Sequence, residues 1–153
     1  MPPDSLASAA SSCCSATCLI WPSPITEISP LPLAPLLNAV DSLNHAAARY
    51  EKAYINALAR GPKAGFRTIN TRLLQAERAL TSPEGLAGRP WYRHLLYAPG
   101  FYTGYGVKTV PGVREAIEQG EWRDAEREIL RAAAAVEREA TLVAQIADAL
   151  SAP

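Results

Sequence analysis

The segment after Pro35 has the apolar periodicity of a helix. Apolar residues recur along it three or four positions apart, at Leu36, Val40, Leu43, Ala47, Tyr50, Tyr54 and Leu58. This spacing places them on one stripe of an α-helix. Gly61 and Pro62 follow, and such a pair ends helices. The pattern therefore predicts a first long helix over residues 36–61.

A shorter helix is predicted next, with an apolar stripe made of Ile69, Leu73, Ala76 and Leu80. Asn70 is a residue type that caps helix N-termini, so we expect it at the start of this helix. The sequence TSPEG at residues 81–85 contains the proline and glycine that stop a helix. A long segment without helical periodicity follows.

Helical periodicity returns at residues 110–112, VPG, because proline is tolerated in the first turn of a helix. We expect Val113 and Ile117 to face inward and Gly120 to end this element. From Glu121 to Ala152 there is neither glycine nor proline. Apolar residues there keep a spacing of three and four, at Ile129, Ala133, Val136, Ala140, Val143, Ala147 and Leu150. This pattern predicts a helix over residues 122–150, which would be roughly 43 Å long.

The alanine run at residues 132–135 makes one section of that last helix thin. Another helix backbone can come close to such a section, so we expect Ala133, Val136 and Ala140 to form a contact face, either within the chain or with another subunit. The neighbouring charges alternate in sign. They are predicted to form a solvated outer face with i,i+4 pairs, made of Glu126, Arg127, Glu128, Arg131, Glu137 and Arg138.

Residues 88–112, GRPWYRHLLYAPGFYTGYGVKTVPG, hold six of the eleven aromatic residues and no carboxylate. Taken alone, the segment is typical of a loop whose rings fill the space between helices. Arg93 and the tyrosine hydroxyls are expected to satisfy its unpaired backbone groups. The residues that we expect to carry this structural role are Arg89, Pro90, Trp91, Tyr92, Arg93 and Tyr97.

Charge and composition exclude some functions and set the N-terminal segment apart. The chain has fifteen basic and fifteen acidic residues, so its formal net charge is zero and it is not a general nucleic-acid binder. Residues 1–35 contain seven of the thirteen prolines and no Lys or Arg. They also hold all three cysteines, at Cys13, Cys14 and Cys18, for which we expect reduced thiols. We predict that this segment is unordered, carries no convincing targeting signal and is too short and polar to span a membrane.

A self-sufficient catalytic site is not evident in the sequence. His45 and His94 have no metal-ligand companion at helical spacing, so both are expected to be structural. The GYG at residues 104–106 lacks the spacing of a dinucleotide-binding loop and does not follow an evident strand. We therefore predict no catalytic residue, no metal ligand and no cofactor in this chain.

The segment from Glu77 to Ile117 carries a specific resemblance. The sequences LLQAERALTSPEGLAGRPWYRHLLYAPG and GYGVKTVPGVREAI closely resemble the C-terminal helical domain of the glutamate carboxypeptidase II and transferrin receptor family. This domain is often called the transferrin-receptor-like dimerisation domain. The resemblance extends from about Leu36 to Leu150, which divides the chain into residues 1–35 and a domain over residues 36–153.

The resemblance implies an all-α fold: a bundle of about four helices with a long C-terminal helix and an aromatic-rich inter-helix loop. It also implies a homodimer across a two-fold axis. In that family each protomer carries a zinc peptidase domain as well, and none of that domain is present here. Zinc is therefore expected only in the missing catalytic domain, and relatives are commonly exported or membrane-anchored.

One site residue is implied by the resemblance. In the carboxypeptidase members, the loop after YAP turns toward the neighbouring catalytic domain. There a Lys-Tyr pair helps to bind the carboxylates of an acidic C-terminal residue. Aligning Pro111 and Gly112 places Tyr105 on the tyrosine and Gly104 on the lysine, with Lys108 three residues later. Tyr105 is the expected substrate-binding residue of a parent enzyme, and a preference for glutamate is doubtful.

The sequence thus predicts a homodimerisation module without a catalytic domain, and no activity of its own. The alternative is a fragment of an active zinc carboxypeptidase that contributes Tyr105 to a catalytic domain encoded upstream or elsewhere. The expected partners are a second copy and, in a parent protein, a zinc peptidase domain. Nucleic acid and a membrane span are not expected.

Overall fold

The computed structural model describes residues 31–61, 66–102 and 104–152. Residues 1–30 of the segment that was predicted to be unordered, including the three cysteines, therefore lie outside the described residues. The elements in chain order are α1 (Ala34–Ala59), α2 (Phe66–Leu73), α3 (Ala76–Ala79), β1 (Tyr97–Pro99), β2 (Val107–Thr109), α4 (Pro111–Glu118) and α5 (Trp122–Ser151). The predicted helical fold with a long terminal helix is confirmed.

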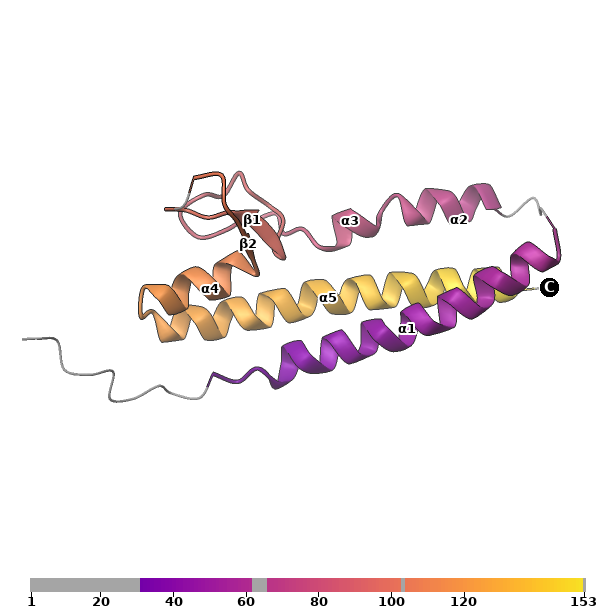
Figure 1. Ribbon diagram of the computed structural model, residues 1–153, viewed down its shortest axis with the longest axis horizontal. Coiled ribbons are helices and arrows are strands. Elements are labelled where there is room, and N and C mark those ends of the chain that lie inside the picture. Colours follow the sequence, from indigo (N-terminus) through magenta and orange to yellow (C-terminus); the bar gives the residue numbers. More distant parts are fainter. Residues whose placement is uncertain (1–30, 62–65, 103, 153) are drawn as a thin grey trace, which may run out of the picture.

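Helix α5 is the axis of the molecule. Helices α1, α2, α3 and α4 all contact it. Figure 1 shows α1 running alongside α5 in the same direction, while α2 and α3 return along the other side. The segment between α3 and α4 gathers over the N-terminal half of α5. We call residues 80–110 the connector.

Helix α1 packs against α5 through small residues. Its buried side alternates three- and four-residue steps, with buried alanines and half-buried larger residues at Leu36, Ala39, Leu43, Ala46, Tyr50, Ala53 and Ala57. Ala39 joins Ala133 and Val136 in one cluster, and Ala53 and Ala57 join Ile146 and Ala147 in another. Alanine on both sides lets the two backbones approach closely.

The stripe predicted for the last helix is confirmed, whereas the one predicted for the first helix is partly wrong. Seven positions of α5 were predicted to face inward, and six of them are buried and the seventh, Val143, is half-buried. On α1, however, Val40, Ala47, Tyr54 and Leu58 are exposed. The predicted α1 stripe ran between two apolar faces, because α1 carries more apolar surface than α5 covers.

The second helix also differs from its prediction. Helical structure is interrupted after Leu73, so that the described residues form α2 over Phe66–Leu73 and the single turn α3 over Ala76–Ala79. Asn70 therefore lies inside α2 with an exposed side chain and does not cap it. Ile69 is the buried residue of α2, where it joins the cluster between α1 and α5. Ile69, together with the half-buried Phe66, docks the short helix at this point.

The connector contains a small sheet that was not predicted. Strands β1 and β2 pair antiparallel, with Tyr97 opposite Thr109 and Pro99 opposite Val107. Each strand has only three residues, which is too short for a two-residue period to be visible in the sequence. The GYG segment lies in the hairpin between them, not between a strand and a helix.

Helix α4 begins directly after the sheet. Val110 stands at its N-cap with φ 43°, a left-handed conformation that is uncommon for a β-branched residue, and Pro111 is buried in the first turn. Val113 is buried as predicted, but Ile117 is 38% exposed and the prediction that it faces inward is wrong. Glu115 and Ala116 are the buried residues in that part of α4.

Enlarging an alanine in the seam between α1 and α5 tests this packing. Ala133→Leu inserts three carbon atoms between α5 and Ala39, so we expect the free energy of unfolding to fall by about 1–3 kcal/mol in urea titrations. Ala134→Leu is the matched control, because Ala134 is the adjacent exposed residue. Its effect is expected to stay within about 0.5 kcal/mol. Equal effects of the two substitutions would contradict the assigned helix face.

Candidate functional site

Two arginines of α5 hold the first part of the connector. Arg131 donates to the carbonyl of Gly85 at 2.7 Å and to the hydroxyl of Ser82 at 3.2 Å. Arg138 donates to the carbonyls of Ala79 and Thr81, each at 3.1 Å. A guanidinium with several donors in one plane suits this task. The connector is therefore fastened to α5 through its backbone.

The prediction of a uniformly solvated charged face on α5 is corrected here. Glu128 is 4% exposed and accepts from Arg131 at 2.7 Å, and Arg131 is itself half-buried. Arg127 pairs with Asp124 in the same i,i+3 relation, instead of the predicted i,i+4 pairs. Spacing alone did not show that Glu128 lies against Gly112 of α4 or that Arg131 contacts the connector.

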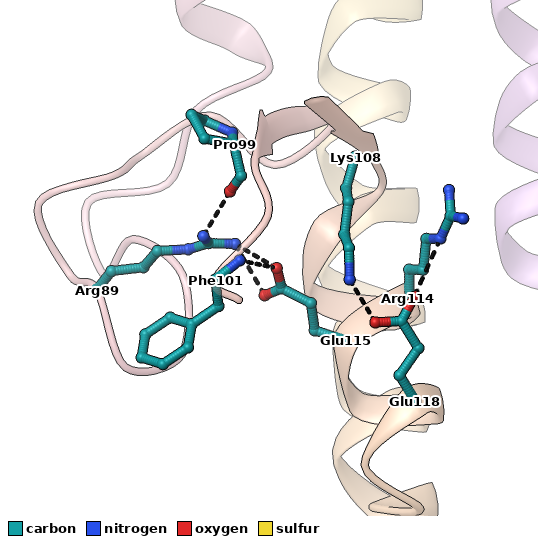
Figure 2. A network of polar contacts seen from close by, with 7 residues as sticks. All are labelled: Arg89, Pro99, Phe101, Lys108, Arg114, Glu115 and Glu118. Carbon is teal, nitrogen blue, oxygen red and sulfur yellow. Dashed lines mark hydrogen bonds and ion pairs between the residues drawn. The ribbon is translucent and has the colours of Figure 1, made fainter. Parts of the chain in front are cut away.

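Arg89 and Glu115 form the buried centre of the connector (Figure 2). Arg89 donates to both carboxylate oxygens of Glu115 at 2.8 Å and to the carbonyl of Pro99 at 2.5 Å. The backbone N–H of Phe101 donates to the same carboxylate at 2.8 Å. The side chains of Arg89 and Glu115 are only 7% and 10% exposed. A bidentate pair with its oxygens satisfied offsets the cost of burying both charges.

Arg89, and not Arg93, satisfies connector backbone, so the expectation for Arg93 is wrong. The Arg93 side chain is exposed, whereas Arg89 is buried beneath the Phe101 ring, 5.7 Å from its centroid. The two arginines lie only four positions apart, so the sequence does not distinguish between them. The deciding partner, Glu115, is 26 residues away from Arg89 and in another element.

The close approach of α4 to α5 explains why the residue after Pro111 is a glycine. A Cβ atom at residue 112 would lie 2.4 Å from the Glu128 Oε2 atom. Any other residue would therefore push the Glu128 carboxylate away from α4. Glycine at this position lets α4 approach α5 at the place where Glu128 also meets Arg131.

Lys108 lies on β2 and turns toward α4. Its buried ammonium pairs with the Glu118 carboxylate, which also accepts from Arg114 at 3.3 Å (Figure 2). The hydrogen bond from Lys108, assisted by Arg114, holds the pKa of Glu118 below its usual value. The ammonium of Lys108 is thus engaged by α4 and is not presented by the loop that carries Tyr105.

That loop joins the two strands. A hydrogen bond of 2.9 Å from the N–H of Gly100 to the carbonyl of Gly106 closes its base. Tyr105 is fully exposed near its end, next to Gly104, which adopts φ 60°. The structure therefore leaves the side chain of the predicted substrate-binding tyrosine fully exposed to solvent.

A second polar cluster links α3 to the connector. The hydroxyl of Tyr97 donates to Glu77, and this hydrogen bond raises the pKa of Tyr97. His94 is buried, and its Nδ1 accepts the N–H groups of Leu96 at 3.2 Å and Tyr97 at 3.3 Å. Its Nε2 lies 3.2 Å from Glu77 without the alignment of a hydrogen bond. This placement gives His94 a structural role in the turn.

The other predicted contact residues lie in different surroundings. Trp91 and Pro90 are exposed, and Tyr92 is half-buried against the cluster of Leu86, Leu95, Ala98 and Ala135. Ala133, Val136 and Ala140 are buried, the first two against α1 of the same chain. Their predicted part in a contact between protomers stays a prediction. His45 is exposed on α1.

Helix α1 presents a second candidate surface. The stripe predicted from the sequence combined residues of this exposed face with residues of the buried face. Large apolar residues are exposed along it: Leu37 at 60%, Val40 at 40%, Ile55 at 58% and Leu58 at 57%. Asn44, Ala47, Ala48 and Glu51 are exposed between them. We call these eight residues the outer stripe of α1. Exposed apolar residues that line up along one helix make this face a candidate interaction surface.

Within the described ranges, no group of three or more His, Cys, Asp or Glu side chains could hold a metal ion. None of the helices in that part of the chain is long and apolar enough to cross a membrane.

Comparison with known proteins gives one family. The sequence profile of the transferrin receptor-like dimerisation domain matches residues 31–144. The chain is 44% identical over 84 residues to the probable glutamate carboxypeptidase LAMP1 of Arabidopsis thaliana, covering 50% of this chain and 12% of that protein. It is 26% identical over 133 residues to the aminopeptidase NAALADL1 of Rattus norvegicus, covering 81% of this chain and 17% of the relative.

A third relative bears on activity. The chain is 32% identical over 69 residues to a protein of Schizosaccharomyces pombe named as the inactive zinc metalloprotease C354.09c, covering 45% of this chain and 9% of that protein. The chain thus spans less than a fifth of the length of each of these three relatives.

Neutralising Glu115 tests the buried pair at the centre of the connector. Glu115→Gln leaves the Arg89 charge buried without its counter-charge, so we expect a loss of about 3–5 kcal/mol in the free energy of unfolding. Arg127→Gln removes one partner of the exposed pair with Asp124, and it is expected to cost no more than about 1 kcal/mol. Chemical denaturation followed by circular dichroism measures both. A Glu115→Gln protein as stable as the Arg127→Gln protein would contradict the assignment.

Proposed function

The chain belongs to the transferrin receptor-like dimerisation domain family, and from this premise we propose that it is a homodimerisation module of a zinc carboxypeptidase-like protein. Its task is to join two protomers across a two-fold axis. The catalytic chemistry of such a protein belongs to a peptidase domain outside the described part of this chain, so no peptidase activity is assigned to this domain alone.

The observation that carries the proposal is the outer stripe of α1. The described domain already covers one face of α1 with α5, yet it leaves a second apolar face of the same helix in solvent. Exposing such a face costs free energy that association would recover, at about 25 cal/mol per Å² of apolar surface buried. The family's designation as a dimerisation domain agrees with this use of the face.

The names of the relatives support a role that is separable from catalysis. Two of them are named as a probable glutamate carboxypeptidase and an aminopeptidase, whereas a third is named as an inactive zinc metalloprotease. Because this domain occurs both in proteins named as enzymes and in one named as inactive, a role in assembly is favoured over a role in catalysis.

Sedimentation equilibrium of the full chain tests the proposal. We expect a concentration-dependent approach to twice the monomer mass of 16.4 kDa, because the outer stripe is apolar and a second copy presents the same surface. Ile55→Glu places a charge in the stripe and is expected to shift the equilibrium toward the monomer by at least tenfold. Leu130→Glu is the control at a similarly exposed apolar residue of α5. A strictly monomeric wild-type chain at high micromolar concentration would refute the proposal.

A second candidate function rests on Tyr105. In a parent enzyme, the exposed loop would bring this hydroxyl to the substrate pocket of the neighbouring peptidase domain. Gly104 supplies no charge there, and the Lys108 ammonium is engaged by Glu118. The hydroxyl would therefore donate to a substrate carboxylate without a cationic neighbour from this loop, which weakens any preference for glutamate.

The genomic sequence immediately upstream and a tyrosine substitution address this candidate. An in-frame peptidase domain with zinc ligands would favour the parent enzyme. In that joined protein, Tyr105→Phe is expected to raise KM for peptides about tenfold, because it removes a hydrogen bond to a charged group. Tyr102→Phe is the matched control in the same loop. An unchanged KM in Tyr105→Phe would exclude this role.

A further inference from the structure

The outer stripe of α1 is complementary to itself when it is reversed. We propose that it forms the two-fold contact: α1 packs antiparallel against α1 of a second copy, with Ala47 and Ala48 at the axis. This inference rests on the proposed homodimerisation and adds to it the contact surface, the direction of the helices and the register.

The first argument is the order of residues along the stripe. In an antiparallel contact between two identical helices, each residue faces a residue at the same distance on the other side of the axis. If the axis lies between residues 47 and 48, each residue of the stripe faces a residue of the same kind: small, polar or large and apolar. The pairs are Ala47 with Ala48, Asn44 with Glu51, Val40 with Ile55, and Leu37 with Leu58.

The second argument is the position of these residues on the helix. At 100° per residue, all eight fall within about 100° of the circumference of α1, which is the width of one helix contact. All eight are exposed, and they lie away from the buried side that faces α5. Figure 1 shows α1 flanked by α5 on one side, with its other side directed away from the rest of the domain.

The third argument is the shape at the centre. Ala47 and Ala48 have the smallest side chains of the stripe, so two copies of α1 can approach to the lower end of the usual 8–10 Å between helix axes. A shallow hollow of about 230 Å³ lies beside Ala48 and is lined by Ala48, Glu51, Lys52, Ile55 and Asn56. The larger apolar pairs then close both ends of the contact.

The polar pair fixes the direction. In the antiparallel arrangement the amide of Asn44 donates to the Glu51 carboxylate of the second copy, and the symmetry produces this hydrogen bond twice. A parallel arrangement would instead place Glu51 beside Glu51, and like charges facing each other between helices are unfavourable. One polar pair within an apolar contact specifies register as well as direction.

A cysteine at the axis tests the geometry in the full chain. Cys13, Cys14 and Cys18 are first replaced by Ser, and Ala48→Cys is then introduced. The two thiols come close only if the two copies of residue 48 meet, because a disulfide requires Cα atoms about 4.4–6.8 Å apart. We expect a disulfide-linked dimer on mild oxidation. Ala34→Cys is the control: the same arrangement separates its two copies by about 40 Å, so it is expected to remain unlinked.

A reciprocal exchange tests the polar pair without disturbing the fold, since both side chains are exposed. Asn44→Glu places two carboxylates opposite each other and is expected to weaken the dimer at least tenfold. Adding Glu51→Asn to it restores the complementary pair, with the order reversed, and is expected to restore the dissociation constant to within about threefold of wild type. Sedimentation equilibrium measures all three proteins.

The outcomes separate this inference from the function on which it rests. A dimer that is not linked through residue 48, or that the exchange at residues 44 and 51 does not restore, would overturn the antiparallel α1 contact and leave homodimerisation standing. A monomeric wild-type chain would overturn both.

Discussion

The small residues of α5 set the distance at which the rest of the chain can approach it. Alanines on α5 meet alanines on α1 in the seam between the two helices, and Ala135 lies beneath Leu86 and Leu95 of the connector. Residue 112 of α4 is glycine, which leaves room for the Glu128 carboxylate. Arg131 and Arg138 then fasten the connector's carbonyl groups to the same helix. One helix therefore positions the seam, the connector and the loop of Tyr105.

The sequence was sufficient for elements that bury one face with a regular period. Helix α5 and its inward stripe followed from Ile129 to Leu150 because one continuous set of positions is buried. Prediction from the sequence failed where one helix has two apolar faces. One face of α1 is buried against α5 and the other is exposed, so the single predicted stripe mixed residues of both faces. The pairing of Arg89 with Glu115 could not be predicted either, because it depends on how the connector folds back over α4. Only the family resemblance singles out Tyr105, and its role in substrate binding stays a prediction, because no physical pattern in the sequence distinguishes it from Tyr102.

The structure divides the work between two surfaces. The connector, held by the buried pair of Arg89 and Glu115, presents the exposed loop of Tyr105, and this is the part that could reach a peptidase domain. Helix α1 presents the outer stripe on the other side of α5. A positive charge on the loop of Tyr105 would help to bind a substrate carboxylate. Gly104 has no side chain and Lys108 is paired with Glu118, so neither residue supplies that charge. The second surface, which is mainly apolar, is the one we propose for association.

The central claim is that α1 joins two copies in antiparallel orientation. The most direct measurement is the distance between identical spin labels attached at residue 34, near the beginning of α1, in a chain whose natural cysteines are replaced by Ser. Antiparallel helices centred on Ala47 and Ala48 place the two labels about 40 Å apart, given the 1.5 Å rise per residue. A distance under about 20 Å would indicate parallel helices. That result, or the absence of any intermolecular distance, would contradict the account.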